Sequence, residues 1–348
     1  MATAIDLGVV ISADSHVMEP HDLWSSALSA RFGDKAPVFA PHQVGQGLQA
    51  HAGGWDPTER IKEMRADGVS AEILYPTLGL PLFALEDAAL QEACFATYND
   101  WLINYCQVAP DRLLGVALIA CYDIGHAVAE LRRCRNNGLR GAEIWLSPPK
   151  NLPFESDHYE PLWAALEELN MPLSMHILTG FSYHTGPVKR GSPADLRGRT
   201  NLKLLDSANA VFDFIHFGIF DRYPGLKLVS VENEIGWLPF LIQQWDYYSR
   251  RFRNSDPLPI EFEPHVYAER NVFATFFNDA VGGHNLSWWG QDNCMWSNDY
   301  PHPNSPWPHS REIIDRDLGA LPPEVLAKLV RENVCRLYNM TPPAPAEA

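Results

Sequence analysis

The chain is poor in cysteine, and none of its cysteines forms a closely spaced pair. Six thiols are spread over 348 residues. No two stand in the CxxC arrangement that zinc ribbons and redox dithiols require. Free, mostly buried thiols are typical of proteins in a reducing cytoplasm. We therefore expect six unpaired cysteines, at Cys94, Cys106, Cys121, Cys134, Cys294 and Cys335.

The chain also lacks a long hydrophobic run, a basic leader and an excess of cations. No apolar stretch approaches the roughly 20 residues that span a bilayer. The opening "MATAIDLGVVISADSH" has no basic region of the kind that begins a signal peptide. The 43 Asp and Glu residues outnumber the 27 Lys and Arg residues, for a net charge of −16. Because nucleic-acid binding needs clustered cations, we expect a cytoplasmic protein with neither a nucleic-acid nor a membrane partner.

What the chain does contain is a repeated alternation of short apolar runs with longer amphipathic segments. Runs that are apolar on both faces and rich in β-branched residues are typical of buried parallel strands. Eight occur, at Val9–Ala13, Ala71–Pro76, Leu113–Ala120, Gly141–Leu146, Met171–His176, Leu226–Glu232, Asn271–Phe277 and Cys294–Ser297. The pattern predicts an α/β protein with a single (β/α)8 TIM barrel. We assign residues 1–340 to this barrel and expect a disordered tail at 341–348.

The segments between the runs predict both helices and long loops. Apolar residues recur at three- and four-residue steps in 87–107, 124–138, 158–170 and 204–225, which predicts helices. Gly138 stands where a helix end favours a residue with positive φ. Connections after strands one and five, and before strand seven, are long, at 19–67, 177–201 and 247–270. In a barrel, loops that leave the carboxyl ends of strands surround the active site.

Histidine and carboxylate side chains follow several of the predicted strands. Asp14 and His16 stand two residues apart where the first strand ends, so both are expected to point to one side. His176 ends the fifth strand, and Asp299 follows the eighth. Imidazole nitrogens and carboxylate oxygens are ligands of catalytic divalent metals, which keep one position open. The four residues therefore predict a metal site at the barrel mouth.

Four motifs resemble the amidohydrolase-related family, a group in the amidohydrolase superfamily. They are "ADSHVMEPHDLW", "MPLSMH", "DRYPGLKLVSVENEIGWLP" and "MWSNDYPHPNSPWPHS". That group includes aminocarboxymuconate-semialdehyde decarboxylase and the resorcylate and carboxyvanillate decarboxylases. The resemblance implies a TIM barrel with one divalent ion, commonly zinc, held by Asp14, His16, His176 and Asp299. It also implies that Asp299 carries a proton, and that the protein forms a homodimer.

One departure from the family concerns the end of strand six. Many relatives have a histidine there, whereas this chain has Glu232, Asn233 and Glu234. We expect Glu232 and Glu234 to line the site as ligand or base, and an oxygen donor in place of nitrogen favours manganese over zinc. His302 is expected near the mouth, as a catalytic group or as a residue that shapes the loop around Asp299. These residues leave the metal site intact and the reaction open.

Two further sets of charges are candidates for supporting roles. Glu19 is expected either to orient His16 from behind, a common need at metal sites, or to fix the turn after strand one. Arg197 and Arg199 lie in the long loop after strand five of an otherwise acidic chain. They predict either a solvated loop or a lid whose guanidinium groups bind a substrate carboxylate.

Three functions follow as alternatives. The first is metal-dependent decarboxylation of a small aromatic or unsaturated carboxylate, and the second is hydrolysis of an amide, ester or lactone by a metal-activated water. The third is a barrel that binds a ligand without catalysis. Retention of all four ligand-type residues disfavours the third, because converging buried carboxylates are costly to keep. The absence of a GxSxG elbow disfavours a serine hydrolase.

Overall fold

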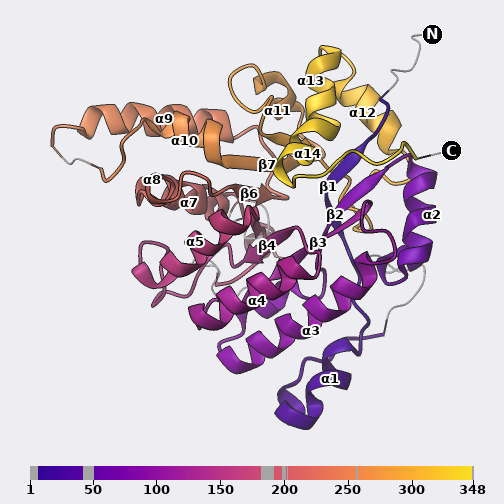
Figure 1. Cartoon of the computed structure of the whole chain (residues 1–348). Helices are drawn as coiled ribbons and strands as arrows, with labels where there is room; N and C mark the ends of the chain where they lie inside the picture. The colour runs from indigo at the N-terminus through magenta and orange to yellow at the C-terminus, as the bar shows by residue number, and fades with distance from the viewer. Residues whose placement is uncertain are drawn as a thin grey trace, which may run out of the picture.

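The structure is a computed structural model that describes residues 7–41, 51–181, 192–197, 201, 203–255 and 258–346. Eight parallel strands follow one another in chain order, each paired with the next. They are β1 (Ile11–His16), β2 (Ala71–Tyr75), β3 (Leu113–Leu118), β4 (Gly141–Ile144), β5 (Leu173–His176), β6 (Leu228–Val231), β7 (Val272–Phe276) and β8 (Cys294–Trp296). Asp299 N donates to Asp14 O at 3.0 Å, which joins the segment after β8 to β1. The predicted TIM barrel is confirmed (Figure 1).

Helices connect the strands and surround them (Figure 1). They are α1 (Leu23–Phe32), α2 (Pro57–Asp67), α3 (Ala88–Cys106), α4 (Ile124–Asn136), α5 (Glu160–Leu169), α6 (Pro193–Arg197), α7 (Lys203–His216), α8 (Ile219–Arg222), α9 (Leu238–Phe252), α10 (Pro264–Asn271), α11 (Ala280–Asn285), α12 (Ser310–Leu318), α13 (Pro323–Ala327) and α14 (Asn333–Leu337). Short 3-10 turns occupy Gly33–Lys35, Ala52–Gly54, Leu80–Ala84 and Asp157–Tyr159, and a π-helical turn occupies Lys328–Glu332.

Local sequence explains where several helices begin and end. Asp56, Asp87 and Asp123 accept hydrogen bonds from the first free backbone N–H groups of α2, α3 and α4, which is what an N-cap carboxylate does. Gly138 follows α4 with φ of 98°, as predicted. The prediction of a single helix over 204–225 is wrong. This segment is divided into α7 and α8 at Gly218, whose φ of 66° ends the first helix.

The barrel interior is closed at the end where the strands begin. Val334, Leu337 and Tyr338, from α14 and the residue after it, belong to the same buried cluster as the inward residues of β1, β2 and β3. Tyr75 Oη lies 2.9 Å from Ser174 Oγ and 3.3 Å from Tyr338 Oη. The opposite end, at the carboxyl ends of the strands, is where barrel enzymes place their active sites.

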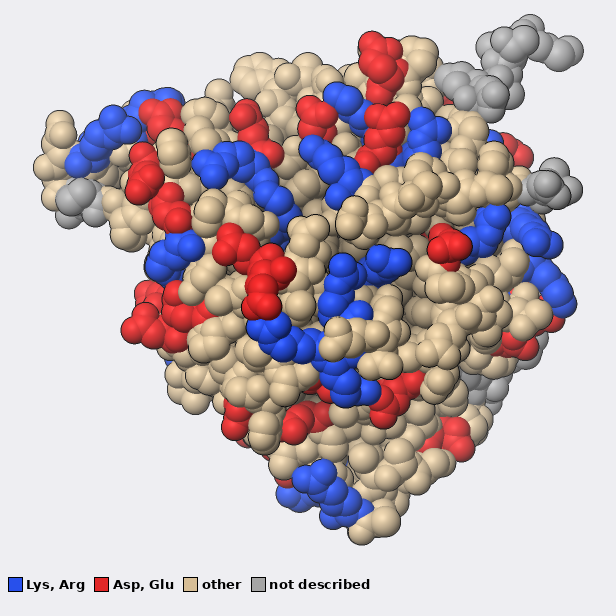
Figure 2. Space-filling model, in the orientation of Figure 1, with Lys and Arg blue, Asp and Glu red and all other residues tan. Residues whose placement is uncertain are grey.

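The cysteines, the carboxyl-terminal residues and the surface charges were also the subject of predictions. All six cysteines are unpaired, and five are buried, as predicted. The disordered tail expected at 341–348 stays a prediction: Ala346 N donates to Ser70 Oγ at 3.1 Å, and residues 347–348 lie outside the described residues. Within the described ranges, none of the helices is long and apolar enough to cross a membrane. Cationic and anionic side chains are interspersed on the face shown in Figure 2.

Candidate metal centre

Asp14 and His16 enter the mouth of the barrel together at the end of β1. The pairing register between β1 and β2 shifts between Ser12 and Ser15, and such a bulge re-aims the side chains beside it. Both Asp14 and His16 are fully buried. Asp14 Oδ1 lies 3.5 Å from His16 Nε2, so the two side chains meet, as their spacing predicts.

His176, at the end of β5, faces His16 across the mouth. Their Nε2 atoms are 3.3 Å apart. His16 Nδ1 lies 2.7 Å from Pro76 O, and His176 Nδ1 lies 2.9 Å from Ile177 O. A carbonyl oxygen can only accept, so each Nδ1 is assigned the proton and each Nε2 carries a lone pair. Burial lowers the pKa of His176 to about 3 and that of His16 well below its usual range, so both rings are neutral.

Two carboxylates complete this group. His16 Nε2 lies 3.4 Å from Asp299 Oδ1, and His176 Nε2 lies 3.9 Å from Asp14 Oδ1. Burial raises the pKa of Asp14, and the nearby His176 and His302 act in the opposite direction. Among the residues that the structure describes, Asp14 Oδ1 has no hydrogen-bond partner. A buried carboxylate oxygen beside two imidazole lone pairs needs a cation.

These donor atoms fit a divalent metal ion. Adjacent ligands at about 2.1 Å from one ion lie about 3.4 Å from one another in tetrahedral coordination and about 3.0 Å in octahedral coordination. The separations within Asp14, His16 and His176 are 3.3, 3.5 and 3.9 Å, and the separation between His16 and Asp299 is 3.4 Å, all near these values. The Nδ1 bonds to backbone carbonyls are the orienting contacts that metal-bound histidines usually make. Asp14, His16 and His176 form one group of closely spaced ligand-type atoms, and Asp299 reaches it through His16, whose Nε2 lies 3.4 Å from Asp299 Oδ1.

Glu232 also reaches this centre, from the end of β6. Its Oε2 atom lies 3.4 Å from His176 Nε2. It belongs to a second group of closely spaced ligand-type atoms with His16, Asp299 and His302. Glu232 N donates to Thr275 Oγ1 at 2.9 Å, and Thr275 Oγ1 donates to Asp14 Oδ2 at 3.4 Å. The Glu232 carboxylate therefore lies close enough to His176 to serve as a metal ligand or as a base.

Three carboxylate residues near the mouth have unusual backbone angles. Glu232, Glu234 and Asp299 have φ of 57°, 56° and 50°. Residues other than glycine seldom adopt this left-handed region, and such strain concentrates at active sites. The backbone just after β6 and β8 therefore adopts a conformation that is uncommon for residues other than glycine.

His302 is paired with Asp299. Its Nδ1 atom lies 2.8 Å from Asp299 Oδ1, and its Nε2 atom lies 3.1 Å from Thr77 Oγ1. The imidazole also stacks on the His16 ring, with centroids 3.9 Å apart. A histidine bonded to a carboxylate at a metal site can pass a proton to it. Its predicted place beside Asp299 is thus what the structure shows.

Glu19 and Glu234 occupy other places than the metal ligands. Glu19 accepts hydrogen bonds from the backbone N–H groups of Thr77, Leu78 and Gly79, at 3.2, 2.9 and 2.9 Å. This loop follows Pro76, whose carbonyl binds His16, so Glu19 acts on His16 through the loop. Glu234 Oε2 accepts from Phe277 N at 3.3 Å. Neither residue belongs to a ligand-type group in the described part of the chain.

The predicted substrate-binding arginines are only partly described. Arg197 is exposed at the end of α6. Arg199 lies outside the described residues. Their binding of a substrate carboxylate stays a prediction.

Two buried polar residues on the barrel strands were not predicted from the sequence. Thr275 on β7 links Asp14 to Glu232, but a threonine within an apolar strand carries no distinguishing pattern. Glu143 on β4 is fully buried, and its charge in the apolar run "GAEIWL" is a signal that could have identified it.

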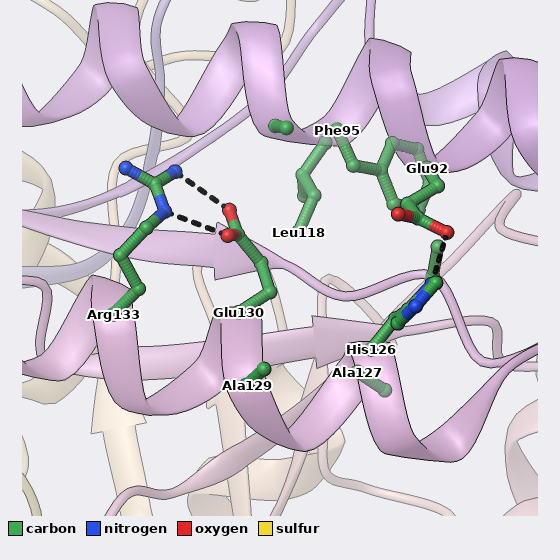
Figure 3. Close-up of a pocket in the computed structure, with 10 residues that line it drawn as sticks. Glu92, Phe95, Leu118, His126, Ala127, Ala129, Glu130 and Arg133 are labelled. Carbon is green, nitrogen blue, oxygen red and sulfur yellow. Dashed lines mark hydrogen bonds and ion pairs between the residues drawn. The ribbon is translucent and has the colours of Figure 1, made fainter.

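A cavity between α3 and α4 is separate from this centre. It has a volume of about 250 Å³ and lies outside the barrel wall (Figure 3). Its charged side chains form pairs, His126 with Glu92 at 3.1 Å and Arg133 with Glu130 at 2.7 Å. None of the residues that line the cavity belongs to the metal centre.

The barrel and the histidine–carboxylate set at its mouth define a TIM-barrel metalloenzyme. The family described as amidohydrolase matches residues 13–340. The chain belongs to this family.

Known proteins resemble the chain over most of its length. Gamma-resorcylate decarboxylase of Rhizobium sp. (strain MTP-10005) is 26% identical over 302 residues, which cover 81% of this chain and 86% of that protein. The solved 5-carboxyvanillate decarboxylase of Novosphingobium aromaticivorans, complexed with manganese, has a TM-score of 0.74 and 21% identity, covering 96% of this chain and 97% of that one. Dihydroxybenzoic acid decarboxylase of Polaromonas sp. JS666, with manganese and the inhibitor 2-nitroresorcinol, has a TM-score of 0.72 and 20% identity, covering 95% and 97%. The two solved structures share the fold of this chain.

Proposed function

We propose that the protein is a divalent-metal-dependent decarboxylase, which releases the carboxyl group of a small aromatic carboxylate as CO2. The observation that carries the proposal is the convergence of Asp14, His16, His176 and Asp299, with His302 bonded to Asp299. The curated relatives named gamma-resorcylate decarboxylase support it.

The residues that would hold the ion are Asp14, His16, His176 and Asp299, with Glu232 as a further oxygen donor. When bound, the ion supplies a Lewis acid that orients the substrate carboxylate and an adjacent oxygen. Zinc is the ion that the sequence resemblance implies. The oxygen donor in place of a histidine favours manganese, and manganese is present in two solved proteins of the same fold.

The chain's own contribution to the reaction is a proton. When the bond between the ring and the carboxyl carbon breaks, its electron pair stays on the ring carbon, which must be protonated. Asp299 is the proposed carrier of that proton. His302 Nδ1, 2.8 Å from Asp299 Oδ1, can return a proton to Asp299 after each turnover. Thr77 Oγ1, at 3.1 Å from His302 Nε2, holds the ring in place for this step.

Hydrolysis is the second candidate, because of Glu232. Its carboxylate lies 3.4 Å from His176 Nε2 at the position where relatives have a histidine. A carboxylate there can accept the proton of an attacking water. This reaction would use an amide, ester or lactone as substrate and would leave the ring–carboxyl bond intact.

The experiment that separates the two reactions is a substrate screen with the manganese-loaded and the zinc-loaded enzyme. Hydroxylated benzoates are assayed for CO2 release, and amides, esters and lactones are assayed for hydrolysis. We expect CO2 release, which Asp299→Asn abolishes. Hydrolysis without any CO2 release would replace the proposal by its alternative. If Asp299→Asn kept the activity of the wild type, the metal centre would not be the site of either reaction.

We also propose that the enzyme is a homodimer. Helix α9 extends from the barrel (Figure 1) and exposes Phe240, Tyr247 and Tyr248 by 61%, 53% and 48%. Apolar groups gathered on a surface are typical of protein contacts. Light scattering coupled to size-exclusion chromatography would measure the mass of the particle, and the mass of a single chain would contradict the proposal.

A further inference from the structure

Glu143, which the proposed reaction does not use, faces the inside of the barrel from β4. Its neighbours Ala142 and Ile144 belong to the hydrophobic layer between strands and helices. Successive residues of a strand point to opposite faces. Gly141, two residues before Glu143, faces Tyr338 of the inner cluster. The side chain of Glu143 is therefore directed inward.

Glu143 also lies at the mouth end of the barrel. It pairs in the sheet with Ser174 of β5. The next residue of β5 that faces the same way is His176, a proposed ligand. β4 ends at Ile144, so Glu143 is its last inward residue. Side chains at this level of a barrel contact substrates, whereas those at the other end stabilise the fold.

The carboxyl group of Glu143 lacks a hydrogen-bond partner among the residues that the structure describes. It is fully buried, and within the described ranges neither oxygen accepts or donates a hydrogen bond. Glu72 of β2 provides the contrast, since it is also buried but accepts from Arg60 Nε at 2.5 Å. Buried polar groups in native proteins nearly always have partners, so the partner of Glu143 comes from outside the described residues, as a bound substrate would.

A metal ion is not that partner, because Glu143 belongs to neither ligand-type group at the mouth. Burial raises the pKa of Glu143 well above its usual range, and the charges of Asp14 and Glu19 raise it further. The group is then a neutral carboxylic acid with one donor and one acceptor oxygen. A hydroxyl group, which also donates and accepts, is its natural complement.

We propose that Glu143 is a substrate-binding residue that hydrogen-bonds a ring hydroxyl of the substrate. This inference rests on the proposed function, since it takes the substrate to be an aromatic carboxylate. It makes Glu143 a determinant of specificity. A substrate without that hydroxyl leaves the buried carboxyl unsatisfied, and sites of this kind reject such analogues.

The test uses two inhibitors that cannot lose CO2. 2-Nitroresorcinol, which inhibits a relative of the same fold, has one ring hydroxyl more than 2-nitrophenol. Their dissociation constants are measured with the metal-loaded enzyme and its Glu143→Met and Glu143→Gln variants. We expect the wild type to prefer 2-nitroresorcinol by about tenfold, the typical value of one hydrogen bond. The preference should vanish in Glu143→Met and persist in Glu143→Gln, whose amide also donates and accepts.

Thermal unfolding without inhibitor gives a second readout. Glu143→Met should raise the midpoint, because an unsatisfied carboxyl is removed, whereas the matched variant Glu72→Met should lower it by leaving Arg60 unpaired. A preference unchanged in Glu143→Met, or a midpoint lowered as in Glu72→Met, would overturn the inference and leave the proposed function intact. A wild type that binds neither inhibitor would overturn the proposed function, and the inference with it.

Discussion

The Nε2 atoms of His16 and His176 lie 3.3 Å apart, while the Nδ1 atom of each ring is bonded to a backbone carbonyl. Neither ring can donate to the other through Nε2, so two lone pairs are held face to face. One histidine comes from β1 and the other from β5, on opposite sides of the barrel. A cation between them therefore ties together two halves of the fold that are 160 residues apart in sequence.

This arrangement predicts that the metal stabilises the protein. Removal of the ion with a chelator should lower the thermal midpoint, and His176→Ala should abolish metal binding. Binding at a ligand concentration 100 times the dissociation constant contributes about 2.7 kcal/mol to the free energy of unfolding. Elemental analysis is expected to find one divalent ion per chain in the wild type and none in His176→Ala.

The control for this experiment is His126→Ala. His126 lies on the outer surface, paired with Glu92 at 3.1 Å, and its loss should change neither metal content nor the effect of the chelator. Failure of the wild type to take up manganese or zinc would show that the four ligands do not form a site.

The pair of His302 and Asp299 predicts a variant that binds metal but turns over slowly. His302→Asn removes the group that lies 2.8 Å from Asp299 Oδ1. Because positioned proton transfer contributes about 10²- to 10⁴-fold to a rate, kcat should fall by that factor with metal content unchanged. His309→Ala, at an exposed site beside Glu312, is the control. A normal kcat in His302→Asn would show that His302 only shapes the loop around Asp299 and transfers no proton.

Glu232 and Glu234 are expected to differ, although both were predicted to line the site. Glu232→Gln removes a charge that lies 3.4 Å from His176 Nε2. Such contacts contribute about 10- to 100-fold to metal affinity or activity. Glu234→Gln should leave metal affinity within a few-fold, since its carboxylate is bonded to Phe277 N. Competition with a metal-binding dye measures the metal affinity of both variants. An equal loss of affinity in the two would contradict the different roles expected for Glu232 and Glu234.

The strands could be predicted from the sequence because a strand buried on both faces is a short continuous run of apolar residues. All eight apolar runs became strands, and Asp14, His16, His176 and Asp299 met at the mouth because the ends of parallel strands share one edge. Gly218 shows where local patterns fail. Apolar periodicity continued through it, but its positive φ divided one predicted helix into two.

The hydrogen-bond partner of a side chain is harder to predict than its place in a strand or loop, because the partner often comes from a residue distant in sequence. Glu19 was expected either to orient His16 or to fix the turn after strand one, and it accepts from the backbone of the loop that carries the His16 acceptor. Glu143 was passed over inside a strand pattern. That it has no hydrogen-bond partner among the described residues becomes visible only when the neighbouring strands are in place.

The buried carboxyl of Glu19 predicts a pH-dependent stability. Burial raises the pKa of Glu19 to about 7, from about 4.3 in an unfolded chain. Between these values the folded state binds more protons, so the contribution of Glu19 is fully present below about pH 4.3 and is lost as the pH rises through 7. At about 1.4 kcal/mol per unit, the loss amounts to at most about 4 kcal/mol.

Glu19→Gln should remove this dependence, because an amide does not ionise in this range. Free energies of unfolding in urea, measured at pH 5, 6, 7 and 8, should fall more steeply in the wild type than in Glu19→Gln. The difference in slope is the quantity to compare, since loss of one acceptor oxygen shifts the Glu19→Gln curve as a whole. Glu168→Gln, at an exposed carboxylate paired with Arg132, should run parallel to the wild type. Parallel curves for Glu19→Gln would mean that Glu19 is ionised in the folded protein throughout, held by the three N–H groups of the loop after β2.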